Sequence, residues 1–142
     1  MGLQDKINLR TVKGKVGYKI TKFQIINEDP GASSVELIAK IYTKDQTGSI
    51  NPLVDFTESD LIAMAYYIDK PGGNDFVGEN VIFDDVVVNQ NIFISAQDSG
   101  GNTKECNYYI EMESMALSDL ESTMLTLKNL RTVTSRWVNN II

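Results

Sequence analysis

Short apolar segments recur along this chain, and clusters of turn-forming residues separate them. The clearest alternation of apolar and polar side chains is in Val35–Ile41 and Cys106–Met112. Strict alternation places the apolar side chains on one face of a strand, so we expect Val35–Ile41 to be half-buried. About six to eight short strands, spaced about ten residues apart, are typical of an antiparallel β-sandwich or jelly roll. The other expected strands are 16–27, 61–68, 81–83, 86–88 and 92–96.

Two of these strands and one turn allow more specific predictions. In Val16–Asn27 the apolar positions change parity after Ile20, which predicts a bulge or a strand buried on both sides. Leu61–Ile68 is apolar at both parities, which fits a buried strand or a short helix, and its aromatic end favours the strand. The polar, glycine-rich run Asp98–Asn102 predicts a hairpin between the strands that flank it.

The pattern changes after Met115. Ser118 and Glu121 have the spacing of a capping box, in which the two side chains satisfy free backbone donors at the start of a helix. Apolar residues then follow at helical spacing, at 120, 124, 127 and 130. We expect an all-β antiparallel sandwich at residues 16–142 with one short helix near 118–131, which covers an edge or an open end. Residues 1–15 are expected to form an N-terminal arm or an irregular first strand.

Composition excludes several functions. The chain has 142 residues, a net charge of −6, no histidine and one cysteine. An acidic chain repels phosphate backbones and anionic bilayers, so we expect neither a nucleic acid nor a membrane as a partner. Without histidine, Ser-His and Cys-His nucleophile pairs and the usual zinc sites are not available. We predict Cys106 to be a buried small hydrophobe rather than a nucleophile.

Carboxylates are the remaining candidates for catalysis or metal binding. Asp84 and Asp85 are adjacent, with Glu79 and Asp98 as further candidates, but adjacent side chains on a strand point to opposite faces. The turn that begins at Asp98 lacks the spacing of a calcium-binding EF-hand loop. We therefore predict no enzyme activity, no metal or cofactor site and no small-molecule substrate.

Both ends of the chain contain candidate interface residues. Basic side chains concentrate in the first segment, where they could guide it onto an acidic neighbour or could simply be solvated. The apolar C-terminal end either packs on its own sandwich or contacts a partner. The candidate residues are Lys6, Arg10, Lys13, Trp137, Val138, Ile141 and Ile142.

Two Tyr-Tyr pairs lie on expected strands, Tyr66-Tyr67 and Tyr108-Tyr109. Neighbouring strand residues face opposite sides, so each pair is expected to place one ring in the core and one outside. An exposed aromatic ring can stack on a sugar or anchor a protein interface.

The order of several motifs resembles a group of small, mostly uncharacterised proteins of marine tailed phages. The matching segments are YKITKFQII at 18–26, IFDDVVVNQNIFISAQ at 82–97, CNYYIEME at 106–113 and LSDLESTMLTLKNLR at 117–131. The resemblance implies a structural part of the virion, such as a capsid decoration or cement protein, assembled in the host cytoplasm. It implies capsid protein and further copies of the chain as partners, with a trimer favoured, and no enzymatic residues. The alternatives are a carbohydrate-binding β-sandwich and an enzyme with a carboxylate pair.

Overall fold

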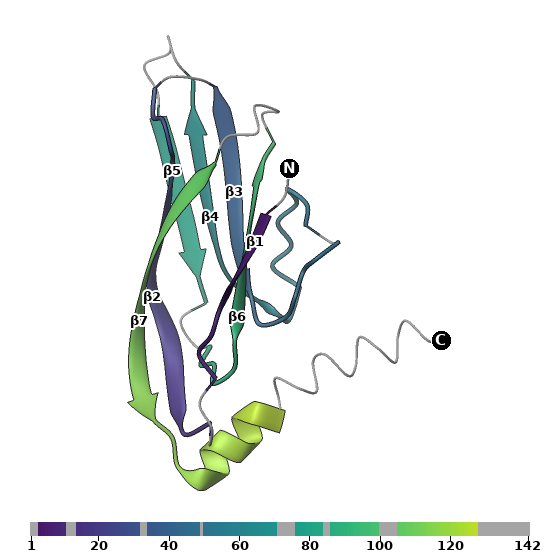
Figure 1. Ribbon diagram of the computed structural model, residues 1–142, viewed down its shortest axis with the longest axis vertical. Coiled ribbons are helices and arrows are strands. Elements are labelled where there is room, and N and C mark those ends of the chain that lie inside the picture. Colours follow the sequence, from purple (N-terminus) through teal and green to yellow (C-terminus); the bar gives the residue numbers. More distant parts are fainter. Residues whose placement is uncertain are drawn as a thin grey trace, which may run out of the picture.

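The computed structural model describes residues 3–10, 14–31, 34–48, 50–70, 76–83, 86–99 and 105–127. These residues form two antiparallel sheets and one short helix at 119–127, which confirms the expected all-β, sandwich-like fold (Figure 1). The strands are β1 (Leu3–Ile7), β2 (Val16–Asn27), β3 (Val35–Tyr42), β4 (Leu61–Asp69), β5 (Phe76–Ile82), β6 (Ile92–Asp98) and β7 (Cys106–Ala116).

The larger sheet has five strands in the order β1-β6-β3-β4-β5, and the smaller sheet pairs β2 with β7. Consecutive strands β6 and β7 therefore belong to different sheets, and the hairpin predicted at Asp98–Asn102 is wrong. A glycine-rich run permits a tight reversal but does not require the flanking strands to pair with each other. This connection instead carries the chain from one layer to the other.

A bulge in β2 explains its change of apolar parity. The pairing of β2 with β7 shifts register between Ile20 and Lys22, as one of the two predicted alternatives required. The extra residue brings both Ile20 and Phe23 to the inner face, where they are 5% and 0% exposed. Truncation of a side chain as buried as Phe23 to alanine costs about 3–5 kcal/mol in general.

A row of small side chains crosses the inner face of the larger sheet. Ala39 pairs with Ala96 on one side and with Ala65 on the other, and Ala65 pairs with Asn80. The side-chain amide of Asn80 donates to the carbonyl of Phe23 at 3.0 Å, which places β2 against this row. Small residues here leave room for the larger side chains of β2.

The expectation that β3 is half-buried is wrong. Three residues on its outer face, Ile38, Lys40 and Tyr42, are buried like those on its inner face. The long connection from β3 to β4 covers that face, and the Lys40 ammonium donates to the carbonyl of Leu53 at 2.6 Å. Burial lowers the pKa of Lys40, and the nearby Glu58 carboxylate raises it in part. The alternation within a strand does not reveal whether a loop from elsewhere in the chain covers its outer face.

Two other segments that were expected to be strands differ in their outcome. Leu61–Asp69 is a strand, not a helix, as its aromatic end suggested. The segment expected as a strand at 86–88 forms only an isolated bridge, between Val88 and Tyr18. That bridge ties the connection before β6 to β2, and it positions the following residue, Asn89, under the helix.

Candidate interaction surface

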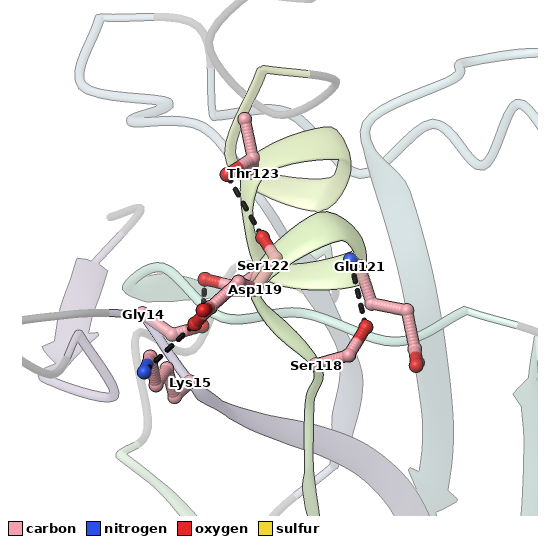
Figure 2. Close-up of polar contacts among 7 residues, drawn as sticks. All are labelled: Gly14, Lys15, Ser118, Asp119, Glu121, Ser122 and Thr123. Atoms are coloured by element: carbon pink, nitrogen blue, oxygen red, sulfur yellow. Dashed lines mark hydrogen bonds and ion pairs between the residues drawn. The ribbon is translucent and has the colours of Figure 1, made fainter.

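The helix at 119–127 begins with the cap that the sequence predicted. The backbone N–H of Glu121 donates to the Ser118 hydroxyl at 3.2 Å, which satisfies one of the free donors of the first turn (Figure 2). Asp119 lies in that turn, where a negative charge is favoured, and it pairs with the Lys15 ammonium at 2.7 Å. Both partners of the ion pair are exposed, so it contributes little to stability.

Polar contacts hold the inner side of this helix. The Ser122 hydroxyl, on a residue 5% exposed, donates to the carbonyl of Gly14 at 2.8 Å. The amide of Asn89, which is 0% exposed, donates to the same carbonyl at 3.0 Å and to the Thr126 hydroxyl at 2.7 Å. We call these four residues the polar anchor of the helix: Gly14, Asn89, Ser122 and Thr126.

Gly14 is required at the centre of the polar anchor. Its φ of +61° lies in the left-handed region, which L side chains rarely adopt. A Cβ at this position would come within 3.0 Å of the Asn89 amide nitrogen and 3.3 Å of the Ser122 hydroxyl. The absence of a side chain therefore lets the chain before β2 approach the helix closely.

The same helix exposes three large apolar side chains. Leu120, Met124 and Leu127 are 70%, 62% and 60% exposed. A helix on the surface of a monomer normally turns its apolar stripe toward the core and its polar residues toward water. Here three large apolar side chains of the described turns are turned outward instead. We call Leu120, Met124 and Leu127 the apolar stripe.

An apolar groove lies beside the apolar stripe. It has a volume of about 610 Å³ and is lined by Val87, Met115, Leu117, Glu121, Met124, Leu125 and Leu127. Two stripe residues, Met124 and Leu127, therefore form one wall of the groove. The stripe and the groove therefore adjoin each other on this helix, which lies at one end of the sandwich (Figure 1).

Of the residues that the sequence singled out for an interface, two lie among the described residues, Lys6 and Arg10. Lys6 is exposed on β1, and its charge contributes to the lowered pKa of Asp45, after the hydrogen bonds that Asp45 accepts from Thr47 and Gln4. Arg10 is exposed, and its backbone N–H donates to the Asn91 side chain. Lys13, Trp137, Val138, Ile141 and Ile142 lie outside the described residues.

The tyrosine pairs meet in a second groove, of about 510 Å³, which residues of β2, β4, β5 and β7 line. All four of Tyr66, Tyr67, Tyr108 and Tyr109 line it. Tyr67 is buried at 2% exposed, but Tyr108 and Tyr109 are 39% and 54% exposed, so the expected inward ring is absent from the second pair. The Tyr108 hydroxyl donates to Asp5 at 3.1 Å and the Tyr109 hydroxyl to Glu111 at 2.9 Å.

The candidate catalytic groups do not converge among the described residues. Burial raises the pKa of the Cys106 thiol to about 11, so little of it is thiolate near neutral pH. Asp98 accepts the backbone N–H of Glu36, which gives this carboxylate a structural partner. Asp84 and Asp85 lie outside the described residues. Within the described ranges, no three histidine, cysteine, aspartate or glutamate residues are grouped so that they could hold a metal ion.

Sequence reasoning missed Gly14 and Asn89, because one lies in an expected arm and the other in an expected turn. The i, i+4 spacing of Ser122 and Thr126 does mark a polar face, but spacing alone does not say which face of a helix is inward. The helix described here is too short to span a membrane. No family model, no curated protein and no solved structure matches the chain.

Proposed function

We propose that this chain is a non-enzymatic structural protein of a tailed-phage virion, in which it binds the capsid and further copies of itself. The resemblance of four sequence segments to small phage proteins supports the virion assignment. The observation that carries the binding role is the exposed apolar stripe of the helix. Soluble monomers seldom leave such a surface bare, so a protein partner accounts for it best.

A decoration or cement role also suits the rest of the molecule. Such a protein needs a rigid scaffold and an exposed contact surface, and it needs no catalytic groups. The sandwich provides the scaffold, and the polar anchor fixes the helix to it. The resemblance favours three copies per assembly.

Mass spectrometry of purified virions tests the proposal. Particles of the phage that encodes this sequence should contain the protein in a fixed ratio to the major capsid protein. Infected-cell lysate serves as the control for expression. A protein that is abundant in the lysate and absent from washed particles would contradict a structural role in the virion.

A second candidate function is carbohydrate binding, and the tyrosine-lined groove is the observation that favours it. Aromatic faces stack on sugar rings, and Asn80, Asn107 and Glu79 add polar groups to the same groove. A glycan array with the wild type and Tyr109→Ala tests this alternative. Phe56→Ala is the matched control, because Phe56 is also 54% exposed but lies outside the groove. No binding to any glycan, or equal loss in both variants, would exclude this alternative.

A further inference from the structure

We infer that the apolar stripe and the adjoining groove form a self-association surface, on which the same surface of a second copy of this chain packs. This inference rests on the proposed function and assigns the contact between copies to one face of one helix. It leaves the capsid contact to other parts of the molecule.

The first support is that the helix cannot simply turn its apolar side inward. Ser122 and Thr126 face the sandwich and are bonded to Gly14 and Asn89 there. Rotation of the helix about its axis would break these bonds and bury unsatisfied polar groups. The apolar stripe is therefore held outward by the contacts of the opposite face.

The second support is the spacing of the apolar stripe. Leu120, Met124 and Leu127 follow one another at intervals of four and three residues. Intervals of four and three residues place apolar side chains along one line of a helix. Two such helices can pack side by side along this line, with large side chains of one helix between those of the other.

The third support concerns the chain's own end as an alternative occupant. Residues 128–142 follow directly after Leu127, the last residue of the apolar stripe. To cover the stripe, a segment that starts at its last residue has to turn back along the helix. Its sequence contains neither glycine nor proline, the residues that most favour a sharp reversal. A second copy meets no such constraint.

The fourth support is that the stripe and the groove adjoin on one face of the molecule. The groove is lined by Val87, Met115, Leu117, Glu121 and Leu125, together with Met124 and Leu127 of the stripe itself. When two identical surfaces meet about a symmetry axis, the apolar surface of each copy can cover that of the other. The contact then buries the apolar area of both copies.

Cysteine cross-linking of the isolated full-length chain tests this inference. Met124 is the middle residue of the apolar stripe, so it faces its counterpart whether the two helices run in the same or in opposite directions. The Met124→Cys variant should form a disulfide-linked dimer under mild oxidation. The matched control is Leu53→Cys, because Leu53 is 72% exposed on the loop between β3 and β4. Native Cys106 adds little background, since its pKa is about 11.

The expected result is that Met124→Cys cross-links about tenfold faster or more than Leu53→Cys, because association raises the effective thiol concentration. Adding Leu120→Glu to Met124→Cys should reduce cross-linking to the control rate, while adding Leu53→Glu should not. Equal rates for the two cysteine variants would overturn the inference. If the thiol introduced by Met124→Cys then resists a labelling reagent, the chain's own end covers the stripe. If that thiol labels freely, the stripe has no occupant in the isolated chain.

This experiment is independent of the virion measurement. A protein absent from virions whose Met124→Cys variant cross-links would contradict the proposed function alone. A protein present in virions whose isolated chain is monomeric would contradict the inference alone.

Discussion

Gly14 combines two demands on one residue, a left-handed backbone and a close approach to three polar side chains. Gly31 also has a positive φ, of +83°, but no atom lies within 4 Å of its would-be Cβ. A comparison of Gly14 with Gly31 therefore separates the cost of a left-handed backbone from the cost of crowding by neighbouring side chains. In the sequence the two glycines look alike, and only the tertiary contacts distinguish them.

We predict that Gly14→Ala is more destabilising than Gly31→Ala. The left-handed backbone alone costs an L residue about 1–2 kcal/mol, and Gly14→Ala adds the displacement of Asn89 and Ser122. Denaturant unfolding of both variants measures the difference in the free energy of unfolding. Equal losses would mean that the polar anchor contributes nothing beyond the conformation of the glycine.

Tyr67 makes stability depend on pH in the alkaline range. Burial raises the pKa of its phenol, and the neighbouring Asp69 carboxylate raises it further. Above a pH of about 10 the unfolded chain loses the phenol proton while the folded chain retains it, so the free energy of unfolding should fall as pH rises. Unfolding titrations of the wild type and Tyr67→Phe between neutral and alkaline pH test this. The variant should show a shallower fall.

Lys40 acts in the opposite direction. Its pKa is lowered by burial, so the folded chain releases this proton first, and stability should rise as pH approaches the ordinary lysine value. The wild type and Tyr67→Phe both contain Lys40, so its opposite contribution to the pH dependence is the same in each protein. If Tyr67→Phe and the wild type had identical alkaline profiles, burial of the phenol would not affect its ionisation.

At the scale of the elements, the helix cap is a local feature that the sequence predicts well. Ser118→Ala removes the acceptor of the Glu121 N–H and should cost about 1 kcal/mol. Ser118→Asp should retain most of the stability, because aspartate caps helices as well as serine does. Thermal unfolding measures both variants. An alanine variant as stable as the aspartate variant would show that the cap is not needed.

Local signals also gave the bulge of β2 as one of two alternatives and favoured a strand over a helix at Leu61–Ile68, and the structure has both the bulge and the strand. Both depend on side-chain order within one segment. The errors arise where a distant segment decides the outcome. The outer face of β3 is buried because a loop covers it, and β6 does not pair with β7 because each finds its partner in another sheet.

The candidate surface illustrates the same limit. The apolar spacing of 120, 124 and 127 predicted a helix correctly, but it did not say which way that face is turned. The polar anchor decides the orientation instead, and Gly14 and Asn89 are far from the helix in sequence. The sequence therefore located the helix, and the contacts among distant residues revealed which face it exposes.

At the scale of the whole molecule, two forces act on an encounter between copies. The net charge of −6 opposes close approach, and the apolar stripe and groove favour it. Salt screens the repulsion and does not weaken apolar burial, so self-association should persist or strengthen as ionic strength rises. An assembly held mainly by ion pairs would respond in the opposite way.

Sedimentation velocity of the unmodified full-length chain, over a series of concentrations and at low and high salt, tests the account most directly. The question is whether the protein assembles through the exposed face of its helix. We expect a species larger than the monomer whose population grows with concentration and survives high salt. A single monomeric species at every concentration and both salt conditions would contradict it.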